Sequence, residues 1–332
     1  MSTGKGPWVK LIFFSALFCV VLLLINLPPI DTYIASLKES DLQVIARPSP
    51  DAESDDLTEQ IQALARKFNQ DPVDAKIDRV WKAIPGYNGI RINEEKSIRI
   101  AKAIGKVVPE HLVIEEVEPE VTLDDLPPNP IYRGNPRKTM VSFMINVAWG
   151  TEYIEEMLDT FAEYDVKATF FLDGKWLSRN KALAQQIASE GHEIGNHAYS
   201  HPDLRQMSVK EIKGEIEQTQ HLIRELGIES HLFAPPSGAF DHRVVNVAHG
   251  QKLKTILWTL DTVDWKKPSA DQMVERVVPK LDNGALVLMH PTFSTIEALP
   301  RLIEGAKQKE LAIGTVSEVI SPARSLSIVR LE

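Results

Sequence analysis

From residue 139 onward, short apolar segments of strand type alternate with segments of helical periodicity, and this alternation is the strongest constraint on the fold. The strand-like segments are residues 140–145, 168–172, 231–233, 255–260, 285–289 and 311–316. Repeated β/α units imply parallel strands joined by right-handed crossovers. The number of units favours a β/α barrel over an open sheet, so functional side chains are expected where the strands end at their carboxyl termini.

The N-terminal region contains an uncharged apolar run, residues 11–27, preceded by Lys5 and Lys10. Its length is at the lower limit for crossing a bilayer. A cleavable signal peptide has a shorter apolar region and a small-residue cleavage site, whereas Pro28 and Pro29 follow here. We expect an uncleaved signal anchor in preference to a signal peptide or a buried core helix. The basic flank predicts a single-pass protein of the cell membrane whose C-terminal domain is extracytoplasmic.

The remaining chain predicts four regions. Residues 1–30 form a cytoplasmic tip and a transmembrane signal anchor. Residues 31–114 form a spacer, polar over 33–56, and a small α/β module with helical patterns near Leu57 and Ile98 and a strand-like segment at 112–114. An acidic, proline-rich linker is expected over 115–138, and the barrel domain over 139–325.

Charge and cysteine content exclude two classes of function. The formal net charge of −9 repels phosphate backbones, so a nucleic-acid partner is not expected. The chain has one cysteine, Cys19, which excludes an intramolecular disulfide and a cysteine-based zinc site.

Four residues stand where chemistry is expected. His197 and His201 have the i, i+4 spacing of a metal-binding histidine pair, although two surface histidines near a turn fit the same pattern. Asp264 follows the predicted strand 255–260, and His290 directly follows the apolar strand 285–289. A histidine at the end of a barrel strand is suitably placed for acid–base chemistry, but it also fits a structural role at the rim.

In this order, the segments resemble the polysaccharide deacetylase family, the NodB-homology carbohydrate esterases of family 4. The resemblance covers about residues 140–319, and five motif segments carry it: 143–150, 197–201, 234–238, 261–265 and 288–290. Segments 167–171 and 191–197 are also typical of the family. The resemblance implies a distorted (β/α) barrel of the NodB type that removes acetyl groups from N-acetylated polysaccharides.

The resemblance also implies roles for individual residues. His197 and His201 would be ligands of a divalent metal such as zinc, which activates water in this family. The catalytic residues would be His290, as the acid that protonates the leaving amine, and Asp264, which orients it. The substrate-binding residues would be Pro235 and Trp265, as apolar walls, and Ser237, whose backbone would supply an oxyanion donor.

The first motif departs from the family pattern. The position of the catalytic base is occupied by Asn146, and the position of the third metal ligand by Val147. An amide cannot accept the proton of water near neutral pH, and valine cannot coordinate a metal. Ala234 replaces an arginine that pairs with the base, and Ala198 replaces Ser or Thr in the second motif. Metal binding is therefore expected to be weak or absent, and the usual N-deacetylation is not expected.

Three interpretations remain open at this point. The chain is an inactive or weakened deacetylase domain that binds N-acetylated cell-wall glycan, such as peptidoglycan or a chitin-like polymer. Alternatively, it is an active amide hydrolase on acetylated glycan that uses a replacement carboxylate, for which Asp173 is the candidate because it follows the strand 168–172. The third interpretation is a different, metal-free chemistry or a purely structural membrane protein.

Overall fold

The computed structural model describes residues 50–324. The predicted cytoplasmic tip and signal anchor lie outside these residues. Within 50–324, none of the helices combines the length and the apolar character needed to span a bilayer. Among the described residues, those from Ile61 to Arg324 form one compact unit, which contains the predicted barrel domain.

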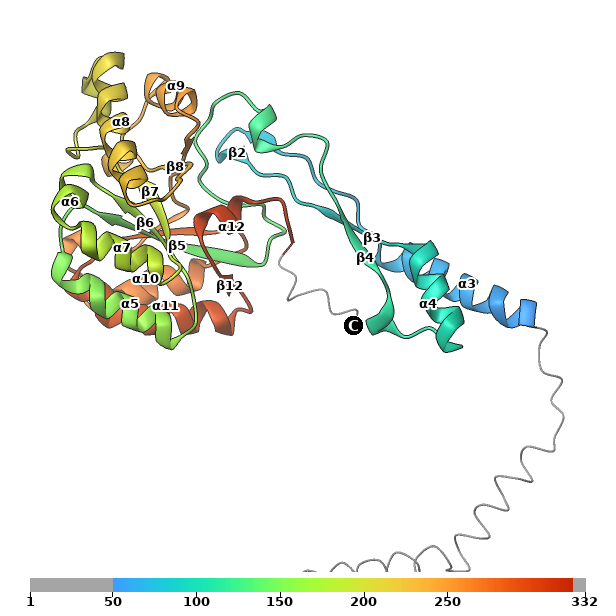
Figure 1. The fold of residues 1–332 in the computed structure, drawn as a ribbon. Coiled ribbons are helices and arrows are strands. Elements are labelled where there is room, and N and C mark those ends of the chain that lie inside the picture. Colours follow the sequence, from blue (N-terminus) through green and yellow to red (C-terminus); the bar gives the residue numbers. More distant parts are fainter. Residues whose placement is uncertain (1–49, 325–332) are drawn as a thin grey trace, which may run out of the picture. The chain divides into compact units, whose positions relative to one another are not determined.

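The centre of this unit is a curved, parallel sheet in the order β10-β11-β5-β6-β7-β8-β9. Its strands β5 to β8 are labelled in Figure 1. An additional strand, β12, pairs with the first half of β5. The two end strands, β9 and β10, are not paired with each other, so the sheet forms a distorted barrel, which confirms the predicted fold class. The strands are β5 (Met140–Val147), β6 (Thr169–Leu172), β7 (Glu193–Asn196), β8 (Leu232–Phe233), β9 (Lys254–Thr255), β10 (Leu260–Asp261), β11 (Leu286–Met289) and β12 (Ala312–Ile313).

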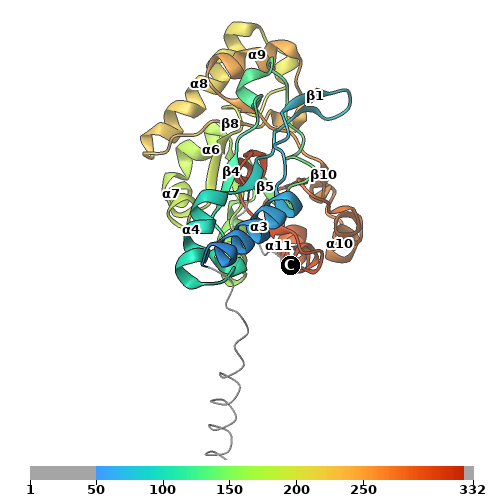
Figure 2. The ribbon, with the colours of Figure 1, turned by 90° about the vertical axis from the view of Figure 1, so that its right-hand side faces the viewer.

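Helices connect successive strands, as expected for β/α units. Helices α8 and α9 lie side by side, as do α10 and α11 (Figures 1 and 2). The helices are α5 (Ile154–Glu163), α6 (Gly174–Arg179), α7 (Lys181–Ser189), α8 (Val209–Glu225), α9 (His242–Gly250), α10 (Ala270–Val277), α11 (Phe293–Gln308) and α12 (Val316–Ile320).

Strand β5 is buried along its whole length, which explains why most of its residues are apolar. Alternate residues such as Phe143 and Ile145 belong to the large apolar cluster that also contains Met157 of α5 and Leu299 of α11. The intervening Met144 belongs to a second cluster with Leu288. Both faces of the strand are thus packed, and only its carboxyl end is left for polar chemistry.

The predicted strand 255–260 is wrong as a single element. It is divided into β9 and β10, and the chain segment around Ile131 pairs with the residues between them: the Ile131 N–H donates to the Thr255 carbonyl, and the Leu257 N–H donates to the Ile131 carbonyl. Ile131 is buried. Residues in the stretch predicted as a linker therefore contribute hydrogen bonds to the barrel wall, because β9 and β10 do not pair across the gap. The proline-rich composition of residues 115–138 gave no signal that Ile131 pairs with the residues between β9 and β10.

The region before the barrel contains two antiparallel strand pairs, β1 with β2 and β3 with β4. Its helix α3 begins at Pro50, inside the predicted polar spacer 33–56, because proline suits the first position of a helix. The predicted strand 112–114 lies slightly further along the chain, in β4. The elements are α3 (Pro50–Phe68), β1 (Lys76–Asp78), β2 (Lys82–Ile84), β3 (Gly89–Ile92), α4 (Glu94–Ile104) and β4 (Ile114–Val117).

The described residues after α12 make hydrogen bonds both to the start of the barrel domain and to the module that precedes it. The buried Lys138 ammonium donates hydrogen bonds to the carbonyls of Glu318, Ser321 and Ala323. Burial lowers the pKa of Lys138 to about 8. Arg324 donates to the Asn88 carbonyl through Nε at 2.7 Å and lies over the Tyr87 ring. The C-terminal residues thus connect the barrel to the module that precedes it.

Candidate functional site

Three histidines predicted from two separate motifs lie close together at the carboxyl ends of the strands. His197 directly follows β7, and His290 directly follows β11. The rings of His197 and His201 are 5.2 Å apart, centroid to centroid. His290 is near enough that its charge lowers the pKa of both other histidines, after the larger effect of their burial. The predicted convergence of these residues in space agrees with the structure, while their chemical roles stay predictions.

The tautomer of His197 is fixed by its surroundings. Its Nδ1 lies 2.7 Å from the Ala234 carbonyl oxygen, which can only accept a hydrogen bond, so Nδ1 carries the proton. Complete burial lowers the pKa of His197 to about 3, which keeps the ring neutral at pH 7. Nε2 therefore retains its lone pair, the arrangement found for histidines that bind metal ions.

The backbone of the site loops is strained. Ala198, His201, Ser237, Val263 and Lys267 all have φ between 55° and 59°. This left-handed region is unfavourable for residues with a side chain, and most of all for a β-branched residue such as Val263. Such strain persists only where the surrounding packing fixes it, and here it lies in the loops that carry His201, Asp264 and Trp265.

Asp264 and His290 form a hydrogen-bonded pair. The Asp264 carboxylate is completely buried and accepts from the His290 N–H at 2.5 Å, from His290 Nδ1 at 2.7 Å and from Thr295 Oγ1 at 2.9 Å. With Nδ1 held by the carboxylate, Nε2 is the ring nitrogen available to another group. The contact is compatible with the orienting role that the resemblance implied for Asp264, and that role stays a prediction.

Asn146 and Val147 stand at the end of β5, in register with Phe171 and Leu172 of β6. The Asn146 side chain is buried, and its Oδ1 has no hydrogen-bond partner among the described residues. Val147 is completely buried in the large apolar cluster. Neither side chain can replace the carboxylate that the family pattern places there.

The donor set does not fit a usual catalytic zinc site. Such sites use three protein ligands. Here His197 and His201 are the two histidine ligands, and Asn146 and Val147 occupy the positions of the family's two carboxylates. Within residues 50–324, no group of three or more histidine, cysteine, aspartate or glutamate side chains could hold a metal ion. The described side chains therefore do not supply the ligand set of a catalytic zinc ion.

Asp173, the candidate replacement carboxylate, has a structural role in the described contacts. Its side chain accepts a hydrogen bond from the Trp176 N–H at 2.9 Å and caps helix α6. Burial raises the pKa of Asp173 to about 6, although hydrogen bonds from the Trp176 and Lys175 backbone oppose this effect. The Asp173 carboxyl group thus caps the N-terminus of α6, and it does not form a metal-binding group with the histidines.

The three predicted substrate-binding residues differ in exposure. Pro235 is buried next to Ala234, whereas Ser237 is exposed in a short left-handed turn. Trp265 is 54% exposed and lines a cleft of about 830 Å³ together with Asp264 and Thr292. Of the three, Trp265 has the large exposed apolar side chain, and its role in binding a substrate stays a prediction.

Sequence reasoning missed two residues of this region. Trp149 stacks on the His290 ring, with centroids 5.7 Å apart and an interplanar angle of 9°. Thr295 is the third hydrogen-bond partner of Asp264. Trp149 lies within the first motif segment, 143–150, which was a usable signal, but its pairing with His290 is long-range in sequence and depends on the adjacency of β5 and β11.

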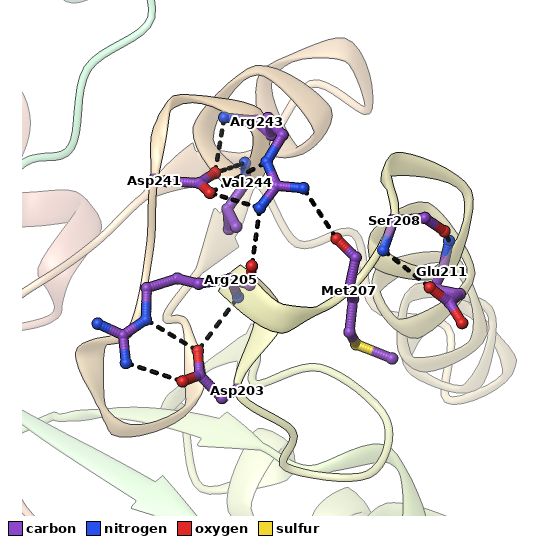
Figure 3. Close-up of polar contacts among 8 residues, drawn as sticks. All are labelled: Asp203, Arg205, Met207, Ser208, Glu211, Asp241, Arg243 and Val244. Atoms are coloured by element: carbon purple, nitrogen blue, oxygen red, sulfur yellow. Dashed lines mark hydrogen bonds and ion pairs between the residues drawn. The ribbon is translucent and has the colours of Figure 1, made fainter.

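The loop between His201 and α8 is held by Arg243, the second residue of α9 (Figure 3). Its guanidinium binds the Asp241 carboxylate and also donates to the carbonyls of Arg205 and Met207, at 2.8 and 3.0 Å. These bonds connect the loop that follows the second motif to helix α9.

Comparison with known proteins places the chain in a family. The sequence model of polysaccharide deacetylase matches residues 133–256. The uncharacterized protein YlxY of Bacillus subtilis is 42% identical over 96% of this chain and 98% of its own length. A peptidoglycan-N-acetylglucosamine deacetylase of Bacillus cereus is 30% identical over 58% of this chain and 72% of its own length.

Solved structures give the same result. The crystal structure of BA3943, a CE4 family pseudoenzyme from Bacillus anthracis, is 43% identical and covers 81% of this chain and 96% of its own, with a TM-score of 0.75. A mutant of that protein with restored enzymatic activity has the same TM-score, with 42% identity over 81% of this chain and 99% of its own. The chain therefore belongs to the polysaccharide deacetylase family, carbohydrate esterase family 4.

Proposed function

We propose that this chain is a membrane-anchored, extracytoplasmic protein that binds N-acetylated cell-wall glycan and has lost the deacetylase activity of its family. The observation that carries the proposal is the end of strand β5. The buried Asn146 and Val147 stand where the family has its base and its metal carboxylate, while the Asp264–His290 pair and the two other histidines are retained. The similarity to a pseudoenzyme of the same family supports this interpretation.

The missing groups are sufficient to remove the reaction. Loss of a general base typically costs 10²–10⁴-fold in rate. Loss of an anionic ligand weakens the metal on which the remaining chemistry depends. What the site retains is its shape, a buried neutral histidine and an oriented histidine–aspartate pair, all of which can still serve recognition.

The first experiment restores the lost groups. We expect the full-length chain to release no acetate from N-acetylated chitooligosaccharides or peptidoglycan fragments, with zinc or cobalt added. The double variant Asn146→Asp/Val147→Asp should release acetate, and Ala234→Arg should increase the rate by pairing with the new base. His290→Ala in the same background is the control and should abolish the restored activity.

Two outcomes of this experiment would contradict the proposal. Acetate release by the native chain, abolished by Asp173→Asn, would contradict the loss of activity and favour the replacement carboxylate. Revertants that fold but neither bind metal nor turn over would show that the family mechanism does not apply to this site.

The membrane part of the proposal rests on the apolar run 11–27 and its basic flank. We expect the chain to remain in the membrane fraction with its native N-terminus and to be accessible to protease from outside the cell. A mature N-terminus within residues 28–45 would contradict the anchor.

A further inference from the structure

The β1–β2 hairpin carries exposed apolar side chains far from the motif residues in sequence. Its strands are labelled in Figures 1 and 2. Seven large hydrophobic side chains of residues 50–324 are strongly exposed, and two of them, Ile77 and Val80, belong to this hairpin. Ile77 lies in β1, and Val80, in the turn, has the largest exposed fraction of the seven, 68%. Single exposed apolar residues are ordinary, so the neighbours of these two decide what the hairpin can bind.

Cations surround the two apolar side chains. Lys76 and Arg79 are exposed, and their side chains make no hydrogen bond or ion pair within residues 50–324. Lys82 is a third cation, and its Nζ donates to the Arg79 carbonyl at 3.3 Å. The segment 76–82 contains one carboxylate, that of Asp78. The hairpin is therefore positively charged, although the whole chain has a net charge of −9.

The turn of the hairpin has a fixed conformation. The Asp78 carboxylate accepts hydrogen bonds from the Val80 N–H at 2.7 Å and from the Trp81 N–H at 2.8 Å. Asp78 is paired in register with Lys82, whose φ is 58°. A three-residue loop followed by a left-handed residue is a common way to close a hairpin. Because the turn is formed in advance, its apolar tip loses little entropy on binding.

An aromatic pair lies directly behind the tip. The half-buried Trp81 meets Tyr132 edge to face, with centroids 6.4 Å apart, and the Arg133 guanidinium lies 5.5 Å from the centre of the Trp81 ring. Arg133 also lies 3.8 Å from the exposed Asp282 carboxylate. Tryptophan and tyrosine are enriched where membranes meet water, and apolar residues flanked by cations suit the boundary between headgroups and acyl chains. Residues 76–82 with this pair have the composition of an element that enters the surface of a bilayer.

The predicted anchor keeps the hairpin near a bilayer. Residues 28–49 separate the apolar run 11–27 from Pro50, where α3 begins. A linker of this length spans at most about 70 Å when fully extended, at ~3.3 Å per residue. Contact between the hairpin and the same bilayer is then intramolecular, so a surface too small to hold a free protein is sufficient.

We propose that the β1–β2 hairpin binds the anionic surface of the bilayer that holds the anchor. Ile77 and Val80 enter the boundary between headgroups and acyl chains, and Lys76, Arg79 and Lys82 bind lipid phosphates. The inference rests on the membrane part of the proposed function and goes beyond it, because it assigns a second membrane contact. This contact turns one side of the compact unit toward the bilayer.

The test uses the full-length chain in lipid discs made of phosphatidylcholine alone or mixed with phosphatidylglycerol. Amide hydrogen exchange of residues 76–82 should slow at least about fivefold in the anionic discs, the contribution of one Lys or Arg near an anionic surface. The variant Lys76→Gln/Arg79→Gln should remove the difference between the two lipids. Val80→Ser should accelerate exchange in the anionic discs, because the apolar contact is lost.

The matched control removes the same kinds of side chain elsewhere. Val209 and Lys210, at the start of α8, are both exposed. The variant Val209→Ser/Lys210→Gln should leave the exchange of residues 76–82 unchanged in both lipids. The exchange of β5, which is buried, should not depend on the lipid in any variant.

The outcomes separate this inference from the proposed function. If the chain stays in the discs and residues 76–82 exchange equally fast in both lipids, the inference is overturned and the anchor stands. If the chain leaves the discs without detergent, the anchor fails and the inference fails with it. Protection that rises with the number of chains per disc and ignores the lipid would mean that a second copy covers the hairpin, and it would overturn the inference.

Discussion

At the scale of single residues, Val147 stands at the position where the resemblance to the family implies the third metal ligand. It ends β5 and is completely buried among apolar side chains. A carboxylate at this position would be costly without a partner of opposite charge. The same carboxylate would supply the ligand that His197 and His201 lack.

We therefore expect Val147→Asp to lower the melting temperature of the metal-free protein and added zinc to raise it again, because a ligand that binds only the folded state stabilises it. Thermal unfolding with and without zinc measures both effects. The double variant Val147→Asp/His201→Gln should lose the zinc response. A Val147→Asp protein insensitive to zinc would mean that this side chain points away from the histidines.

Asp173 gives a prediction about pH. Burial raises its pKa in the folded state to about 6, above the ordinary value of 3.8. The folded state therefore binds this proton more tightly, so the contribution of Asp173 to stability falls as pH rises from about 4 to about 6. The asparagine side chain introduced by Asp173→Asn would still cap α6 without a charge.

We expect Asp173→Asn to match the native protein near pH 4 and to exceed it by up to about 2 kcal/mol at pH 7. This order-of-magnitude value corresponds to a pKa raised from 3.8 to about 6, discounted for solvent screening. Denaturant unfolding at pH 4, 5, 6 and 7 measures the difference. Equal stability at every pH would show that the carboxyl is solvated in the folded state.

At the scale of elements, Arg243 fixes the loop between His201 and α8. Its planar fork reaches one carboxylate and two carbonyls, which a lysine cannot reproduce. Arg205, which lies in the same loop, makes an exposed ion pair with Asp203 (Figure 3). The two arginines thus offer a matched comparison.

Arg243→Lys should destabilise the protein by about 1–3 kcal/mol, because the Arg205 and Met207 carbonyls lose the guanidinium N–H donors. Arg205→Lys should change stability by less than about 1 kcal/mol, as is usual for surface ion pairs. Hydrogen exchange of residues 203–208 should accelerate only in Arg243→Lys. Equal effects of the two substitutions would contradict the assigned role of Arg243.

At the scale of the whole molecule, the barrel depends on residues outside its own strands. Ile131 pairs with residues between β9 and β10, and Lys138 binds three carbonyls of the C-terminal segment. A barrel cut at the predicted boundary, residue 139, would lack both.

We expect a chain that begins at residue 139 to melt at least about 10 °C below one that begins at residue 61, because backbone groups of the barrel wall and α12 lose their partners. Thermal unfolding of the two truncated chains measures the difference. Equal melting temperatures would show that residues 61–138 add nothing to the stability of the barrel.

The sequence by itself determined the family, the parallel β/α architecture and the motif residues His197, His201, Asp264 and His290. These are local signals, since apolar runs, helical periodicity and short motifs lie within a few residues of each other. The substitutions at Asn146 and Val147 were also visible in the sequence. What each of these residues does in the native chain stays a prediction.

Only the tertiary structure decided what fills the gap between β9 and β10, which residues orient Asp264 and how the cleft beside Trp265 is formed. Ile131, Thr295 and Trp149 make their contacts with residues that are distant in the chain. Such contacts are fixed by strand order and loop packing, which no local pattern encodes. Trp149, Trp265 and Phe293 line one cleft because β10, β11 and β5 are neighbours in the sheet.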